Sequence, residues 1–281
     1  MGEPRYREYP IRAVLASFIK CIWSLESDGP VYDAVPERIL PDGCVELVFH
    51  FHDPFRTYFA NGESTIQPQS FVVGQMKRFL EIAPAGRIGF VAVRFSARNA
   101  YRFFPESLRE IADGVVDLAS VWKQDADEWT ERVSFARGMN ERLRIMEQAL
   151  VETLCRNDRA DRLVDRCLQL TEARGGQSSV AQLVSEIGTS SRQLTRRFQN
   201  AVGISPKEFA RVSRFLCALR YLRDGKHETL TETAHACGYF DQAHFNHDFR
   251  EFAGMTPREL FTFRMSRSDV RFLQSQKRCR R

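Results

Sequence analysis

The chain has 281 residues, of which 43% are hydrophobic and 27% charged, and a formal net charge of +5. This length is sufficient for two domains, and the sequence shows neither an apolar run near the roughly 18 residues of a membrane span nor a signal peptide. Its seven cysteines form no CxxC motif, which argues against a zinc ribbon or a redox pair and favours small buried side chains in a reducing cytoplasm.

The first 120 residues or so alternate apolar and polar side chains, as half-buried strands do. The clearest strand candidates are 19–25, 45–51, 71–73 and 88–95. Two helices are predicted over 97–104 and 107–118, separated by Pro105. The pattern predicts a small β-barrel or sandwich with flanking helices, and the mouth of a barrel is a common ligand site.

His50 and His52 alternate on a predicted strand and therefore share one face, which raises the question of a metal site. A cupin-type metal site needs a carboxylate shortly after such a pair, and residues 54–62 contain neither Asp nor Glu. The chain also lacks a Walker loop, GxGxxG, GxSxG and HExxH. We therefore expect no metal, no cofactor and no enzymatic activity.

Residues 123–157 are charged, and their apolar side chains recur at steps of three to four residues, which predicts helices interrupted at Gly138. Such a segment either packs back on the barrel or pairs with its copy in a homodimer. The sequence leaves both possibilities open.

The C-terminal part of the chain differs from the N-terminal part in charge. Residues 158–281 hold 22 Lys and Arg against 14 Asp and Glu, whereas residues 1–157 hold 19 against 22. A basic half beside an acidic half indicates that one part binds a polyanion such as double-stranded DNA. The basic residues continue to the end of the chain, in a tail over 266–281.

One pattern occurs twice in the basic half, 51 residues apart: Leu194, Phe198, Gly203, Ser205 and Pro206 are matched by Phe245, Phe249, Gly254, Thr256 and Pro257. Before each copy, a capping box at Ser179–Gln182 or Thr229–Glu232 begins a short apolar-faced helix that ends near a glycine, Gly188 or Gly238. Each copy therefore predicts a helix-turn-helix unit.

The second helix of each unit carries hydrogen-bonding side chains on its outward face, and we expect these residues to contact DNA. In the first unit they are Arg192, Gln193, Thr195, Arg196, Arg197 and Asn200, and in the second they are Gln242, His244, Asn246, His247 and Arg250.

Residues 160–262 resemble the DNA-binding domain of AraC-type (AraC/XylS family) bacterial transcription regulators. The resemblance is carried by 194–198, 203–206, 238–245 and 254–257. It implies seven helices, with a rigid helix joining two helix-turn-helix units. The chain departs from the family at His247, where Arg is common, and at the following Asp248, an acid that phosphate would repel. We therefore expect Arg192, Thr195 and Arg196 to dominate direct readout of the bases.

The stretch 41–49 and the pair Arg94-Phe95 resemble the N-terminal sensing domains of the same regulators. The resemblance implies an α+β protein with an N-terminal β-barrel, cupin-like sensing domain with flanking helices and a C-terminal all-α domain with two helix-turn-helix motifs. The expected divisions are 1–120, 121–157, 158–265 and 266–281.

The implied function is sequence-specific transcription regulation in the cytoplasm, at the nucleoid and away from membranes. The implied partners are DNA, RNA polymerase, a small-molecule effector and a second copy of the chain. Two alternatives stay open at this point. One is a metal-dependent or alkyl-transfer catalytic barrel tethered to DNA, and the other is a front half that answers to a partner protein.

Overall fold

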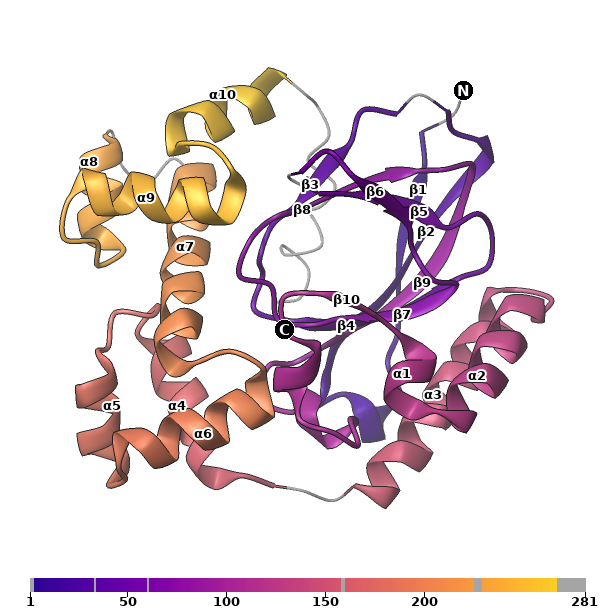
Figure 1. Cartoon of the computed structure of the whole chain (residues 1–281), viewed down its shortest axis with the longest axis horizontal. Helices are drawn as coiled ribbons and strands as arrows, with labels where there is room; N and C mark the ends of the chain where they lie inside the picture. The colour runs from indigo at the N-terminus through magenta and orange to yellow at the C-terminus, as the bar shows by residue number, and fades with distance from the viewer. Residues whose placement is uncertain (1–2, 33, 60, 158–159, 225–228, 267–281) are drawn as a thin grey trace.

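The computed structural model describes residues 3–32, 34–59, 61–157, 160–224 and 229–266. It is a two-domain α+β structure (Figure 1). We call β1 to β10 with helices α1 to α3 the front domain, and helices α4 to α10 the rear domain. None of the described helices is long and apolar enough to cross a membrane.

The front domain contains two antiparallel sheets. The larger has the order β1 (Arg5–Tyr9), β2 (Ile19–Pro30), β9 (Arg87–Phe95), β4 (Val45–His50), β7 (Ser70–Val73) and β10 (Val115–Asp117). The smaller has the order β3 (Glu37–Ile39), β8 (Leu80–Pro84), β5 (Phe55–Tyr58) and β6 (Ser64–Ile66). No ladder between described strands joins the two sheets, so the structure does not show the closed barrel that was expected.

Alternation along β4 gives the larger sheet two apolar faces. Val45, Leu47 and Phe49 belong to the main core, which extends to the helices. Val48 belongs to a second cluster that also includes Phe55 of the smaller sheet, so this face of the larger sheet is turned toward the smaller one.

Three helices cover the outer face of the larger sheet: α1 (Leu118–Trp122), α2 (Gln124–Phe135) and α3 (Met139–Arg156). The buried side chains of α3, among them Ile145, Met146 and Leu150, lie in the main core. The exposed side of α3 is polar, with Arg144, Gln148 and Glu152. Of the two possibilities for this segment, the structure shows that it packs back on the front domain.

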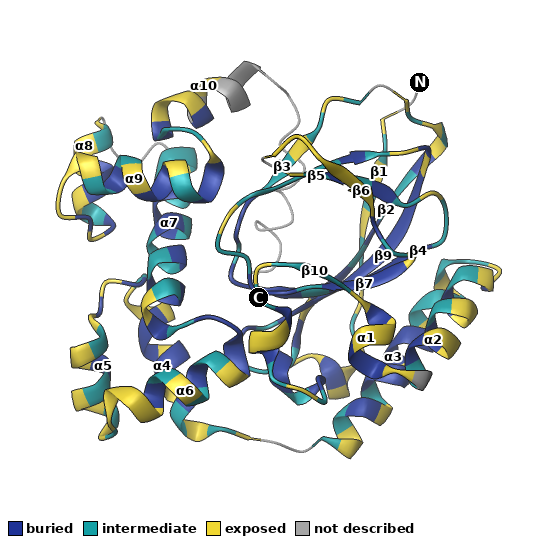
Figure 2. Cartoon of the chain, viewed as in Figure 1, coloured by how far each residue is buried: buried dark blue, intermediate teal, exposed yellow. Residues whose placement is uncertain are grey.

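The rear domain has the seven helices that the sequence resemblance implied, counted over its described residues. They are α4 (Arg162–Ala173), α5 (Val180–Ile187), α6 (Ser191–Val202), α7 (Pro206–Asp224), α8 (Leu230–Ala236), α9 (Gln242–Ala253) and α10 (Pro257–Ser266). Helix α7 joins the two helix-turn-helix units, and buried residues run along its length (Figure 2). The predicted basic tail lies outside the described residues except for Ser266.

The four strands predicted from alternation correspond to β2, β4, β7 and β9, but the two helices predicted before residue 120 are wrong. Only the short 3₁₀ turns η2 (Ala100–Arg102) and η3 (Leu108–Ile111) form there, and 115–117 is an edge strand paired with β7. Asp113 adopts φ 58°, outside the helical region, which ends the second segment early.

His50 is 1% exposed between the sheets, packed against the rings of Phe55, Phe71 and Phe90. Its Nε2 lies 3.2 Å from Oε1 of Gln67. Burial lowers the pKa of His50 to about 4. The ring is therefore neutral at pH 7, and protonating it in the folded state is unfavourable.

We predict that His50 makes the front domain sensitive to acid. The unfolded chain takes up a proton near the ordinary histidine pKa of about 6.5, whereas the folded chain does so only near 4, so stability falls as pH decreases between these values. In His50→Gln this loss, roughly 2–3 kcal/mol, should disappear from the free energy of unfolding measured between pH 7 and pH 4. His235→Gln, at an exposed site, is the control and should keep it. An unchanged pH dependence in His50→Gln would contradict the assignment.

Candidate nucleic-acid interface

Local capping builds both helix-turn-helix units. The Ser179 hydroxyl accepts from the Gln182 amide while the Gln182 side chain accepts from the Ser179 amide, and Thr229 with Glu232 repeats this box at α8. Such boxes satisfy amides that a helix start leaves unpaired. Ser190 and Asp241 then cap α6 and α9. Each second helix therefore begins at a fixed residue, which sets the face it presents to solvent.

The N-terminal half of α6 is open to solvent. Arg192, Gln193 and Arg196 are exposed, and Thr195 is partly exposed. Two other expected DNA contacts are engaged within the protein. Arg197 donates to Asp161 across 2.8 Å, and the Ser107 hydroxyl lies 3.3 Å from Oδ1 of Asn200. These two residues therefore lie toward the front domain and the start of α4.

On α9, Gln242, His247 and Arg250 are exposed, and His244 and Asn246 are partly exposed. The position of Asp248 does not fit the expectation that its carboxylate repels phosphate. Its side chain is 1% exposed and accepts from the Arg211 guanidinium at 2.6 Å, beside Glu251, which accepts from the same guanidinium. Asp248 therefore orients α9 on α7.

His247, Asp248 and Glu251 form the one cluster of potential metal ligands within the described residues. Both carboxylates are already paired with Arg211. That arrangement favours a structural ion pair that joins α7 to α9.

The front domain contacts the C-terminal end of each of these two second helices in the same way. The Ser107 hydroxyl donates to the Asn200 carbonyl of α6 at 3.4 Å, and Arg38 Nη1 donates to the Ala253 carbonyl of α9 at 3.2 Å. Carbonyls in the last turn of a helix lack intrahelical donors and carry partial negative charge. The front domain supplies those donors in both units.

The repeated glycines of the two units lie at these same contacts. A Cβ on Gly203 would approach the Leu108 carbonyl to 3.0 Å, and one on Gly254 would approach Cε1 of Phe79 to 2.6 Å. Both glycines have positive φ, +96° and +69°. Each therefore has two reasons to lack a side chain, the backbone conformation and the nearby front domain.

One stretch of the front domain, residues 38–46, connects its interior to the rear domain. Arg38 stacks on Phe79 and reaches α9, Leu40 belongs to the core cluster of the second unit, and Gly43 lies against the ring of Phe209 on α7. Lys77, after β7, pairs with Glu208 of α7 at 3.1 Å. The same stretch then enters β4.

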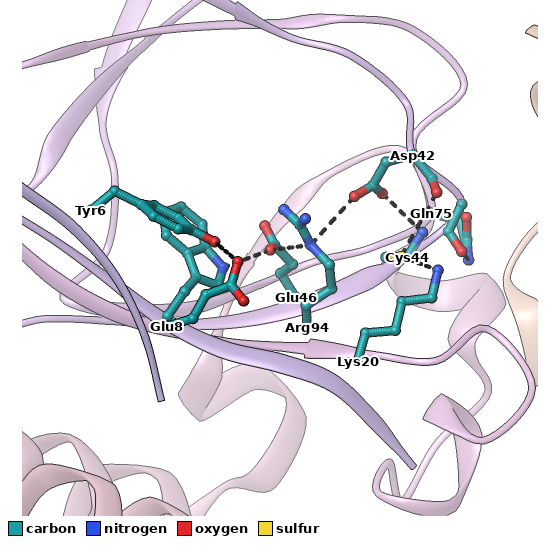
Figure 3. A network of polar contacts seen from close by, with 10 residues as sticks. Tyr6, Glu8, Lys20, Asp42, Cys44, Glu46, Gln75 and Arg94 are labelled. Carbon is teal, nitrogen blue, oxygen red and sulfur yellow. Dashed lines mark hydrogen bonds and ion pairs between the residues drawn. The ribbon is translucent and has the colours of Figure 1, made fainter. Parts of the chain in front are cut away.

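Inside the front domain this stretch holds a buried arginine (Figure 3). Arg94 Nε lies 2.7 Å from Glu46 and 3.4 Å from Asp42, and the Trp23 indole donates to the same Glu46 oxygen. Burial alone would lower the pKa of Arg94, but the Glu46 and Asp42 carboxylates raise it above its ordinary value. The guanidinium stays charged, and it connects β9 to the stretch that contacts the rear domain.

The sequence pattern identified the exposed residues of both units but not Arg38, Phe79 or Ser107. Arg38 and Phe79 lie in segments with no repeat, cap or periodicity that would mark them. Ser107 caps the 3₁₀ turn η3, and that local role gives no sign of its contact with α6. A partial signal was present in the repeated Gly203 and Gly254, but each also had a sufficient explanation as a helix C-cap.

Two family models match the chain. A helix-turn-helix domain matches residues 183–262, and a domain of unknown function (DUF6597) matches residues 7–117. No curated protein matches.

Among solved structures, ToxT from Vibrio cholerae is similar with a TM-score of 0.45 and 10% identity, over 92% of this chain and 98% of that one. The DNA-binding domain of AdpA, in complex with a target DNA, has a TM-score of 0.35 and 25% identity, over 39% of this chain and 99% of that one. The AraC-like transcriptional activator CuxR has a TM-score of 0.27 and 12% identity, over 72% and 77%.

We predict that alanine at Gly203 or Gly254, the two glycines that lie against the front domain, weakens the contact between the front and rear domains. Gly188, which has φ +73° and no atom within 4 Å of the place where a Cβ would lie, is the matched control for Gly254, because both glycines are in the left-handed helical conformation. Gly188→Ala should cost about 1 kcal/mol from backbone strain alone. Gly254→Ala should cost more in denaturant unfolding and should speed proteolysis between α3 and α4, as should Gly203→Ala, whose φ of +96° adds strain of its own. Equal effects of Gly188→Ala and Gly254→Ala would show that the domain contact at Gly254 contributes nothing.

Proposed function

We propose a mode of action for this chain, which is an AraC-type, sequence-specific DNA-binding transcription regulator by its helix-turn-helix match and by the motifs of its two units. In this proposal α6 and α9 are the recognition helices, and they enter successive major grooves about 34 Å apart on one face of the duplex. The front domain contacts both helices at their C-terminal ends and changes their positions in response to a small effector.

The carrying observation is the division of each recognition helix into two ends. The front domain contacts the C-terminal end of α6 and of α9, whereas Arg192, Gln193 and Arg196 of α6 and Gln242 of α9 remain exposed. In helix-turn-helix proteins the N-terminal residues of the recognition helix contact base edges. The interdomain contacts therefore leave the N-terminal residues of α6 and α9 free to contact the bases of DNA.

The expected contacts divide accordingly. We assign Arg192, Gln193, Thr195 and Arg196, with Gln242, His244, Asn246, His247 and Arg250, to the DNA. We assign Arg197 and Asn200 a different role, because their side chains face Asp161 and Ser107. These two residues position α6 for the contacts that the others make.

We place the effector response at Arg94 and the stretch 38–46. Trp23, Phe90 and Val48 belong to the apolar cluster packed between the two sheets, and Arg94 adds a positive charge on the same side of the larger sheet. A ligand that competed for Arg94 would weaken its hold on Asp42, four residues from Arg38. An effector shifts a regulator only by binding one arrangement better than the other, and the stretch 38–46 offers the mechanical connection.

The remaining assignments belong to the same proposal. The front domain is a cupin-like barrel in which the two sheets face each other, and it is not catalytic. The divisions are 1–120, 121–157, 158–265 and 266–281, and the protein acts at the nucleoid in the cytoplasm. RNA polymerase and a second copy of the chain are its macromolecular partners.

We predict that Arg196→Ala weakens binding to a cognate duplex by about 1–3 kcal/mol and relaxes its base preference, as loss of a base-edge contact does. His247→Ala should cost less. Binding by fluorescence anisotropy to cognate and random duplexes measures both. Arg5→Ala is the control, because Arg5 is an exposed arginine of the front domain paired with Asp28. An equal loss on random DNA would make Arg196 a phosphate contact only.

We predict that Arg38→Ala selectively weakens the second unit. Without Arg38, the Ala253 carbonyl loses a charged hydrogen-bond donor, and α9 is less well ordered in the free protein. Binding to DNA must then order α9, and this cost lowers the affinity. The dissociation constant for a duplex with both half-sites should rise about twofold to fivefold, the effect of roughly 0.3–1 kcal/mol. A duplex with the second half-site scrambled should bind the variant and the parent equally. Equal weakening on both duplexes would contradict the selective role.

A further inference from the structure

Two cysteines that lie 20 residues apart in the chain meet inside the second helix-turn-helix unit. Cys217 is on α7, Cys237 is the C-cap of α8, and their sulfur atoms are 3.5 Å apart. Both are buried and in the thiol form. The sequence contains no CxxC motif, so only the fold brings this dithiol together.

The two sulfurs are not equivalent. Cys237 donates its S–H to the Cys217 sulfur, and this hydrogen bond, followed by burial, raises the pKa of Cys237. Donation keeps the proton on Cys237 and stabilises negative charge on Cys217. Arg220, three residues after Cys217 on α7, adds positive charge near the pair. Cys217 is therefore the better nucleophile of the two.

A path to solvent exists on the Cys217 side. Cys217 lines an open groove of about 1040 Å³ between the two units, together with Arg174, Arg220 and Tyr221. Cys237 lies behind it at 0% exposure. Glu172, Glu186 and Asp224 also line the groove, and Arg174 pairs with Glu186. A small disulfide that entered the groove would meet Cys217 before Cys237.

We propose that Cys217 and Cys237 form a thiol–disulfide switch that a low-molecular-weight disulfide oxidises through this groove. The Cys217 thiolate attacks one sulfur of the small disulfide, forming a mixed disulfide and releasing one thiolate, which takes up a proton. Cys237 then loses its proton to solvent and attacks the Cys217 sulfur, releasing the second small thiolate. Two protein thiols become one disulfide, and one small disulfide becomes two small thiols.

The disulfide would act on the second unit through Cys237. Its sulfurs must approach from 3.5 Å to about 2.0 Å. Cys237 and Tyr239 donate their backbone amides to Thr233 and Ala234 of α8, so a pull on Cys237 acts on α8 and on the turn that leads into α9. This consequence for DNA rests on the function proposed above, whereas the chemistry of the pair does not.

The test uses the full-length protein, reduced, freed of reductant and incubated with glutathione disulfide, followed by non-reducing peptide mapping by mass spectrometry. We expect a Cys217–Cys237 linked peptide. Cys237→Ser should instead trap glutathione on Cys217, and Cys217→Ser should yield neither product in this region. Cys155→Ser, which removes an exposed thiol on α3, should leave the linked peptide unchanged. A folded protein that forms no linked peptide, or one that forms it only in denaturant, would overturn the proposal.

A second measurement addresses regulation. The oxidised protein should bind a duplex with both half-sites about tenfold more weakly, bind a duplex with only the first half-site as before, and recover on reduction. Unchanged affinity despite a complete linkage would overturn the regulatory role. If the reduced protein bound no DNA while the linkage formed, the proposed function would fail and the dithiol chemistry would stand.

Discussion

Most of the architecture depends on one constraint, that another domain supplies hydrogen-bond donors to carbonyls in the last turns of α6 and α9, the second helices of the two units. Ser107 serves α6, and Arg38 serves α9. A cation or hydroxyl at a helix C-terminus contributes about 0.3–1 kcal/mol, so neither contact is strong alone. Their importance is geometric, because attachment at Asn200 and at Ala253 fixes the relative positions of α6 and α9 at two separate points. Helix α7 by itself fixes only how far apart the two units lie along its own axis.

The charge buried in the front domain lies beside one of these contacts. Arg94 is 2% exposed, and removing one partner of a buried ion pair typically costs about 3–5 kcal/mol. Its partners Asp42 and Glu46 flank Gly43, where a Cβ would lie 3.5 Å from the ring of Phe209 on α7. Breaking the buried pair therefore costs more than losing a contact of about 1 kcal/mol at a helix end, and the pair anchors the stretch 38–46 from which Arg38 reaches α9.

The rear domain was predictable because its signals are local. Ser179, Thr229 and Gly188 act within one or two turns of helix, and the repeat doubled each signal. The front strands followed from the alternation of apolar and polar side chains, as in β2, but β3, β6 and β8 are too short to show a period. The helices predicted before residue 120 failed because tertiary pairing of Val115 with Val73 overrode the local pattern. The position of Asp248 also depended on Arg211, 37 residues away.

The contacts that link the domains were invisible for a related reason. Arg38 and Phe79 follow no local rule, and the local signal at Ser107 is only its cap of η3. Arg38 and Ser107 donate to backbone carbonyls of α9 and α6, which carry no sequence identity. The sequence did contain Gly203 and Gly254. Each is explained by its place at the end of a helix, and each also lies close to the front domain. A glycine that is repeated at matching positions of two units can therefore mark a contact with another domain as well as the end of a helix. At Gly254 the two explanations separate only when an equally left-handed glycine with open surroundings, such as Gly188, is compared with it.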